Sequence, residues 1–325
     1  TVTFAHHKSG MFTGPGVGHA GSIHRVGLGL PDAEILQAVG WVAEIIEADD
    51  VLAWLGRRAP DCHKYGAGSL LVVAGRPGKV GAALLAARGA LRTGAGIVTI
   101  GTWPAAADSL DTAVAEVMTA RIDPAELDAT LEMALRKRNA VAIGPGLGLD
   151  DDARAVVDAI AIGFEGPAVV DADAISLFAG RPEALQQAAG PRVLTPHAGE
   201  LARLMGSTSA EVEADRFAAA ARASRATGQV VVLKGPKTVV AAPDGRCFIC
   251  PRGSSLLGTA GSGDVLTGMV GALLCVAPPM GAACAAVFVH ATASELWGAD
   301  HGVDRGMVAS DIIDGIPDAI ASLDE

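Results

Sequence analysis

From about residue 69 onward, the hydrophobic and polar positions of this chain alternate between two patterns. Short apolar runs typical of buried strands are separated by stretches with the spacing of amphipathic helices. We expect strands at 69–75, 97–100, 140–144, 168–171, 192–194 and 230–234. We expect helices at 49–58, 82–92, 124–138, 151–162, 209–227 and 282–297, and a last helix after Ser310.

This alternation predicts an α/β fold in three layers. Strands and helices that follow one another at short intervals form a mostly parallel sheet with helices on both faces. A turn at Asp244 and Gly245 joins two further strands within residues 238–249, which adds antiparallel strands at one edge.

The first 32 residues do not continue the pattern. TVTF (residues 1–4) and RVGLGL (25–30) resemble short strands around a glycine-rich loop, and we expect no long helix there. Gly16, Gly18 and Gly21 match the dinucleotide pattern GxGxxG, but we interpret the match as chance because a strand-like stretch follows it. An exposed strand edge has unpaired backbone groups that can pair with another chain. We therefore expect this segment to be poorly ordered or packed against the main domain or a neighbouring subunit. We expect it to contribute nothing to a reaction.

The sequence GTAGSGDVLTG, residues 258–268, predicts a phosphate or oxyanion cradle. The free backbone N–H groups of a helix N-terminus and the positive end of its dipole attract an anion. Asp264 would repel such an anion unless it acts as a base that takes a proton from a substrate hydroxyl during attack on phosphorus. The simpler alternative is that Asp264 caps the helix. The predicted cradle donors are Ala260, Gly261, Ser262 and Gly263.

Two other predicted strands are followed by glycines or carboxylates. In open α/β sheets, ligands bind outside the carboxyl ends of the strands. The glycines of residues 144–148 permit close approach of the backbone to a ligand, although they also suit a plain tight turn. Asp171 and Asp173 end an apolar strand, where they would hold a metal or cap the next helix.

Two more loops place charged side chains at strand ends. His197 and Glu200 lie in LTPHAGE, although a lone histidine is more often structural than catalytic. Lys234 and Lys237 lie in VVLKGPKTVV, and two cations at a sheet end in an acidic protein suit a nucleotide phosphate or ribose.

Charge and cysteine content exclude several other classes. The net charge of −11 disfavours a nucleic-acid or anionic-membrane partner. We expect no transmembrane helix and no signal peptide. The five cysteines, an odd number, suit reduced thiols in the cytoplasm. Cys247 and Cys250 have CxxC spacing, but three residues apart on a strand they point to opposite faces, which favours a structural role.

Six motifs in order resemble the ribokinase-like fold, and more narrowly the ADP-dependent NAD(P)H-hydrate dehydratases, over roughly residues 45 to 322. These are AGRPGKVGAALLAARGALRTGAG, IGPGLG, VVDADAISL, LTPHAGE, LKGPKTVV and GTAGSGDVLTG. Residues 1–32 resemble the closing strands of the epimerase domain that is fused in front of this dehydratase in bifunctional proteins. The resemblance implies a dehydratase domain at 33–325 and an epimerase body, with its catalytic Asp, upstream of residue 1.

The resemblance also implies the roles of several residues. Asp264 would be the base and would also contact substrate, and Glu200 is the first candidate ligand for Mg²⁺. The hydrated dinucleotide would contact Ala82, Gly146 and His197. The ADP or ATP co-substrate would be held by Lys234, Gly235, Pro236, Lys237, Thr238 and Gly263.

The implied reaction repairs NADH or NADPH that carries a hydroxyl on its nicotinamide ring. Phosphorylation makes this hydroxyl a good leaving group, and the ring nitrogen then expels phosphate. Two alternatives remain open: a kinase of the same fold for a vitamin-precursor alcohol, and a nucleotide-binding regulatory module without catalysis. Relatives of this family are commonly homo-oligomers and the helices are rich in Ala and Gly, so we expect a symmetric multimer.

Overall fold

The computed structural model describes residues 1–112 and 115–324. A ten-stranded sheet crosses the molecule in the order β3-β12-β11-β10-β9-β8-β7-β4-β5-β6. Only β11 runs antiparallel to its neighbours, β10 and β12, while β3 pairs parallel with β12 at the edge. The strands are β3 (Glu44–Ile45), β4 (Ser69–Val73), β5 (Ile97–Thr102), β6 (Met118–Arg121), β7 (Ala140–Ile143), β8 (Ala168–Val170), β9 (Arg192–Leu194), β10 (Val230–Leu233), β11 (Val239–Ala241) and β12 (Cys247–Ile249).

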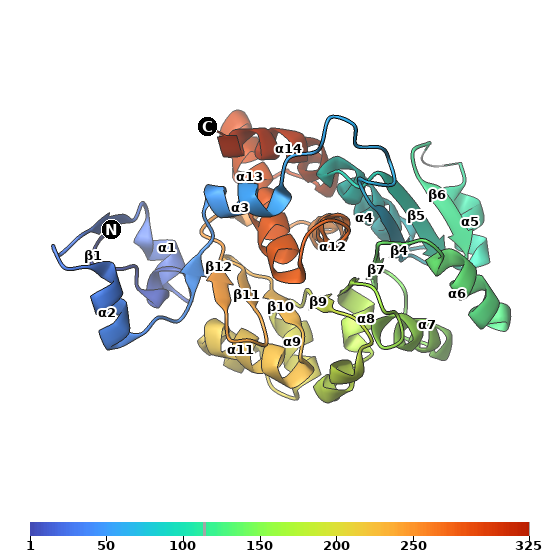
Figure 1. Cartoon of the computed structure of the whole chain (residues 1–325), viewed down its shortest axis with the longest axis horizontal. Coiled ribbons are helices and arrows are strands. Elements are labelled where there is room, and N and C mark those ends of the chain that lie inside the picture. The colour runs from blue at the N-terminus through green and yellow to red at the C-terminus, as the bar shows by residue number, and fades with distance from the viewer. Residues whose placement is uncertain (113–114, 325) are drawn as a thin grey trace.

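Helices cover both faces of this sheet, which confirms the three-layer α/β prediction (Figure 1). Alternate strand residues enter two separate cores, with Leu70 and Val72 in one and Leu71 and Val73 in the other, as the period of a strand requires. One face carries α3 (Ala48–Leu55), α4 (Val80–Thr93), α12 (Ser262–Leu274), α13 (Pro279–His301) and α14 (Ala309–Ala321). The other carries α6 (Leu127–Leu135), α7 (Asp151–Ala161), α8 (Ala172–Ser176), α9 (Ala198–Met205), α10 (Ser209–Ala214) and α11 (Arg216–Thr227). The cysteines also divide, with Cys247 in one core and Cys250 in the other.

Several predicted elements need correction. The helix expected at 209–227 is broken at Asp215, whose extended backbone ends α10 and whose side chain accepts a hydrogen bond from the N–H of Ala218 to open α11. The helix expected at 124–138 ends earlier, at Leu135. The sequence pattern missed β3, β6, α9 and α5 (Pro104–Leu110), all of which are short. Within the described residues, no helix is both long enough and apolar enough to cross a membrane.

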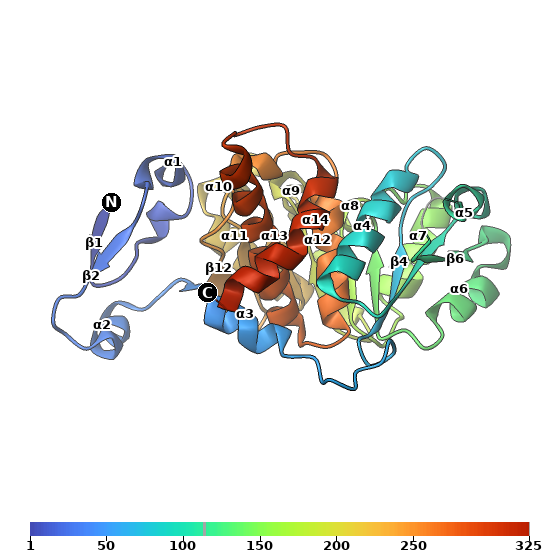
Figure 2. The ribbon, with the colours of Figure 1, turned by 90° about the horizontal axis from the view of Figure 1, so that it is seen from above.

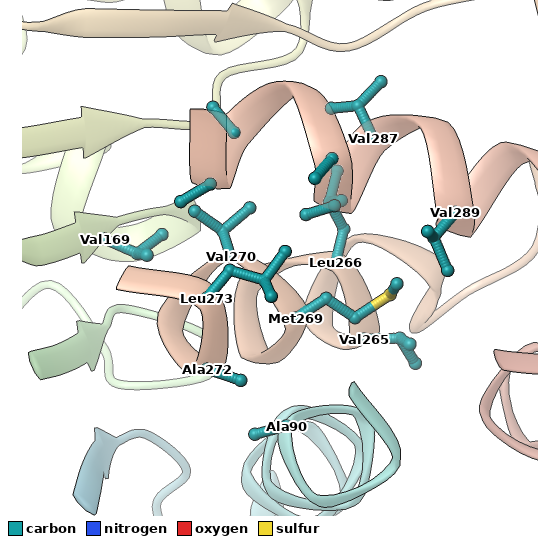
Figure 3. Close-up of a cluster of buried hydrophobic side chains, with 14 of the residues drawn as sticks. Ala90, Val169, Val265, Leu266, Met269, Val270, Ala272, Leu273, Val287 and Val289 are labelled. Carbon is teal, nitrogen blue, oxygen red and sulfur yellow. The ribbon is translucent and has the colours of Figure 1, made fainter. Parts of the chain in front are cut away.

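Helix α12 is the most enclosed helix at the centre of the molecule. Every residue from Val265 to Leu274 is buried. Figure 3 shows its side chains between Val169 of β8, Ala90 of α4, and Val287 and Val289 of α13. Burial of apolar side chains of this size stabilises a fold by about 1.5–3 kcal/mol each, so this helix has one stable position in the core.

The leading segment packs as a separate unit beside the sheet edge (Figure 2). It holds the parallel pair β1 (Val2–Phe4) and β2 (His24–Val26), with the short helix α1 (Gly16–Ala20) between them and α2 (Asp32–Val39) after them. The glycine-rich pattern therefore forms a short helix, and only the start of RVGLGL is a strand. Arg25 pairs with Asp32 at 3.0 Å. This contact lies within residues 1–32, and the domain boundary expected after residue 32 stays a prediction.

The packing of α4 on α12 generates a stability prediction. A Cβ on Gly268 would lie 1.8 Å from the carbonyl oxygen of Ala86, whereas a Cβ on Gly81 would meet nothing within 4 Å. We expect Gly268→Ala to lower the free energy of unfolding by about 1–3 kcal/mol or more, because a backbone has to move. Chemical denaturation measures the change. Gly81→Ala is the matched control and should be neutral or stabilising by up to about 1 kcal/mol. Equal stability of the two variants would contradict the packing argument.

Candidate active site

The predicted cradle lies at the N-terminus of α12. Gly261 precedes the helix with φ of 88°, in the left-handed region that favours glycine. The hydroxyl of Ser262 donates to the carbonyl of Leu257 at 2.8 Å, and Nε2 of His290 lies 3.0 Å from the carbonyl oxygen of Ser262. Burial lowers the pKa of His290 to about 4. His290 is therefore neutral at pH 7, and its Nε2–H donates to Ser262 and fixes the first turn.

Asp264 occupies the first turn of α12, as predicted. Burial, together with the nearby carboxylates of Asp171 and Asp173, raises the pKa of this carboxyl to about 7 against the opposing effect of Lys234. A carboxyl group that titrates near neutral pH is suited to accept a proton from a substrate and to release it afterwards.

Lys234 joins three elements of the site. Its Nζ donates to Oδ1 of Asp171 at 2.8 Å and lies 3.9 Å from Oε2 of Glu200. Oδ2 of Asp171 accepts from the hydroxyl of Thr267 on α12 at 2.5 Å. Burial lowers the pKa of Lys234, but the carboxylates of Asp171, Glu200 and Asp264 outweigh it, so the pKa is raised above the usual value. The ammonium group therefore stays charged beside the cradle.

The residue after Asp171 is strained. Ala172 has φ of 49°, a left-handed value that is uncommon for a residue with a Cβ. Such strain is often found at functional sites. Here it lies between Asp171 and Asp173, the two carboxylates whose roles the sequence left open.

The six predicted nucleotide-binding residues line a single cavity of about 910 Å³. This volume lies within the range of small-molecule sites. The cavity reaches Gly263, the residue before Asp264, and it also includes His197 and His290. The residues are Lys234, Gly235, Pro236, Lys237, Thr238 and Gly263.

A buried arginine supports the loop at the floor of this cavity. The guanidinium of Arg216 donates to the carbonyl of Leu233 at 2.9 Å and to Glu213 at 2.7 Å. A Cβ on Gly235 would lie 2.4 Å from this guanidinium, so a larger residue there would displace the Arg216 side chain. Lys237 donates to the carbonyl of Pro251, which joins the loop to the chain after β12.

Two of the predicted substrate-binding residues lie together outside this cavity. A Cβ on Gly146, whose φ is 62°, would lie 3.3 Å from that of Ala82 and 3.1 Å from that of Lys79. Lys79 lies 3.9 Å from Asp173, which accepts from the N–H of Gly148 at 2.9 Å. The charge of Asp173 acts on Asp264 and raises its pKa. The assignment of Ala82 and Gly146 to substrate binding stays a prediction.

His197 and Glu200 open helix α9 as a reciprocal capping box. Nδ1 of His197 accepts from the N–H of Gly199 at 3.0 Å, and Oε2 of Glu200 accepts from the N–H of His197 at 2.8 Å. The imidazole is half exposed and faces the cavity. The sequence pattern missed helix α9, and it therefore also missed the capping role of His197 and Glu200.

Sequence reasoning also missed His290, Arg216 and Thr267. His290 was detectable as the polar residue within the apolar stretch 282–291. Arg216 and Thr267 had no such signal, because their partners Leu233 and Asp171 lie 17 and 96 residues away.

Residues 70–318 match the protein family described as NAD(P)H-hydrate dehydratase. A bifunctional NAD(P)H-hydrate repair enzyme of Moorella thermoacetica is 37% identical over 334 aligned residues, which cover 100% of this chain. The chain spans only 62% of the length of that relative.

Two solved structures are similar to this chain. The ADP/ATP-dependent NAD(P)H-hydrate dehydratase from Bacillus subtilis, crystallised with ATP and Mg²⁺, has a TM-score of 0.77 at 31% identity over 86% of this chain and 99% of its own. A ribokinase-like superfamily protein from Enterococcus faecalis has a TM-score of 0.73 at 23% identity over 87% of this chain and 96% of its own. The second likeness concerns the fold alone, which is ribokinase-like.

The raised pKa of Asp264 generates a prediction for the protein without ligands. The folded state keeps this proton up to about pH 7, whereas the unfolded chain loses it near pH 4, so stability falls as the pH rises between these values. The side chain in the variant Asp264→Asn does not titrate, so the variant does not lose stability over this pH range. We expect the variant to gain roughly 1–2 kcal/mol relative to the natural protein between about pH 5 and about pH 8, since solvent access reduces the full effect. Urea denaturation at both pH values measures the gain. If the difference in free energy of unfolding between the variant and the natural protein is the same at both pH values, the raised pKa is contradicted.

Proposed function

The chain belongs to the NAD(P)H-hydrate dehydratase family, and from this premise we propose that it catalyses the ADP- or ATP-dependent dehydration of hydrated NADH or NADPH. One observation carries the proposal. The predicted nucleotide-binding residues line one cavity that reaches the cradle, and the next residue is a carboxyl group with a pKa of about 7. A phosphoryl donor and a base are thus adjacent.

In the proposed reaction, the nucleotide phosphates lie along the N–H groups of Ala260, Gly261 and Gly263 and beside the Lys234 ammonium. The fourth predicted donor, the N–H of Ser262, already donates to the carbonyl of Thr259 at 3.4 Å. Asp264 takes the proton from the ring hydroxyl as that oxygen attacks the terminal phosphorus. The amides and Lys234 stabilise the negative charge on the transferring group. His290 keeps the first turn of the cradle in place through Ser262.

The second step completes the dehydration. The ring nitrogen donates its lone pair, the C–O bond breaks, and phosphate leaves with the former hydroxyl oxygen. Loss of the ring proton restores the dihydronicotinamide. With ADP the products are NADH or NADPH, AMP and phosphate. The residues proposed to hold the dinucleotide are Ala82 and Gly146, which lie next to each other, and His197, which lines the nucleotide cavity.

The donor set suits a Mg²⁺ ion that arrives with the nucleotide. Among the residues described, no three His, Cys, Asp or Glu side chains are grouped to hold a metal by themselves. Mg²⁺ commonly binds through substrate phosphates and one or two carboxylates. Glu200 is the proposed carboxylate, as the family resemblance implies. Its Oε2 accepts from the backbone N–H of His197, and its Oε1 lies 3.5 Å from Nε2 of His197. Such an ion would neutralise phosphate charge during transfer.

Incubation with hydrated NADH and either ADP or ATP tests the function directly. We expect the absorbance of reduced nicotinamide to recover only when both components are present. The alternative, a kinase of the same fold, predicts no recovery and instead phosphorylation of a thiazole or pyrimidine alcohol.

We predict that Asp264→Asn lowers turnover about 10²- to 10⁴-fold and leaves nucleotide affinity nearly unchanged, because it removes the base but no nucleotide contact. Turnover and calorimetric binding of ADP measure the two effects. Asp318→Asn, an exposed position on α14, is the charge-matched control. Turnover near that of the natural protein would remove Asp264 from the mechanism.

We propose further that the chain forms a homo-oligomer. The Ala- and Gly-rich helices α12 and α13 are buried within one chain, so their composition no longer supports this proposal, which rests on the family resemblance alone. Light scattering at micromolar concentration should give a multiple of 32.6 kDa. A mass of one chain would contradict it.

A further inference from the structure

The nucleotide cavity has a second wall that comes from the leading segment. Four half-buried apolar residues of that segment line it together with the loop Lys234–Thr238. They lie on α1 and on the two stretches that flank it, and they fall outside the range 70–318 that matches the family. Membership of the family therefore assigns them no role. The four residues are Met11, Val17, Ala20 and Ile23.

The wall is fixed to the domain by a buried anchor. Phe12 is only 6% exposed and belongs to the same core as Phe217 and Ile249, and Met11 and Ile23 pack against that core. The loop behind the wall is compact, because a Cβ on Gly16 would lie 1.7 Å from the carbonyl oxygen of Gly10. The wall is thus held in place by packing rather than lying loosely over the cavity.

The chemistry of the facing surface indicates what the wall covers. The domain contributes Leu266 of α12 and Val287 and Ala291 of α13 to the same cavity. Lys234 and the cradle residues Ser262 and Gly263 supply its polar part. A site with one polar part and two facing apolar surfaces suits a molecule with phosphates and a flat aromatic base.

We propose that residues 11–23 form the outer wall of the adenine subsite, a proposal that rests on the function proposed above. The base lies between this wall and the apolar residues of α12 and α13, while the phosphates reach the cradle. The segment expected from the sequence to contribute nothing therefore contributes to nucleotide affinity. Nucleotide binding in turn holds the segment against the domain, because the two contacts are linked thermodynamically.

The test shortens two side chains of the wall without adding charge. We expect the double variant Val17→Ser, Ile23→Ser to raise the Kd for ADP about tenfold, which corresponds to about 1.4 kcal/mol. Its kcat at saturating ADP should stay within about twofold, because the cradle and Asp264 are untouched. Leu28→Ser is the matched control, since Leu28 is exposed in the same segment and lines no part of this cavity.

Binding of inorganic pyrophosphate distinguishes the loss of a contact with the adenine base from a general loss of structure. Pyrophosphate lacks the base, so the double variant and the natural protein should bind it with equal affinity. If the double variant loses as much affinity for pyrophosphate as for ADP, the proposal is overturned. An increase that is confined to the KM for hydrated NADH would also overturn it. Hydrogen exchange of residues 11–23 provides a second readout, and ADP should slow it in the natural protein.

These outcomes also distinguish this proposal from the proposed function. If the natural protein neither binds ADP nor restores reduced nicotinamide, the proposed function fails. If it does both, and the double variant matches Leu28→Ser in its Kd for ADP, only the wall proposal fails.

Discussion

The close approach of α4 and α12 is the constraint on which the site depends. Gly89 and Gly268 let each backbone contact the other helix, since a Cβ on either would lie under 3 Å from a backbone oxygen. Gly271 likewise meets Leu70 of β4. Because protein interiors are close-packed and tolerate little change in volume, this contact fixes where α12 begins. The cradle, Asp264 and the hydroxyl of Thr267 are all placed by it.

Charge is then concentrated at this fixed helix end. Lys234 binds the Asp171 carboxylate, and Thr267 satisfies its second oxygen, so the buried Asp171 is compensated. Asp264 is less well compensated, and its pKa is raised to about 7. A carboxyl group with this raised pKa costs stability at neutral pH. Under the proposed function it is the base beside the anion site, and such a loss of stability for function is common at active sites.

The sequence predicted what depends on local pattern. Strand ends, the glycine-rich helix start and Asp264 follow from periodicity and from the backbone freedom of glycine, and the structure places them as expected. The break at Asp215 was missed because a continuous apolar pattern hid a local cap. The support of Gly235 by Arg216 and of Ser262 by His290 could not be predicted, because these contacts join residues far apart in the chain.

The same limit applies to the leading segment. Its pattern showed two strands without a sheet, which suggested an inert remnant. The pattern could not show that Phe12 belongs to the same buried core as Ile249 of β12, because this packing depends on how the sheet edge folds. With Phe12 buried in this core, residues 11–23 line one side of the nucleotide cavity. The main domain thus supplies the polar part of the site, and the preceding residues supply an apolar wall. Movement of those residues would change nucleotide affinity without any change in the cradle.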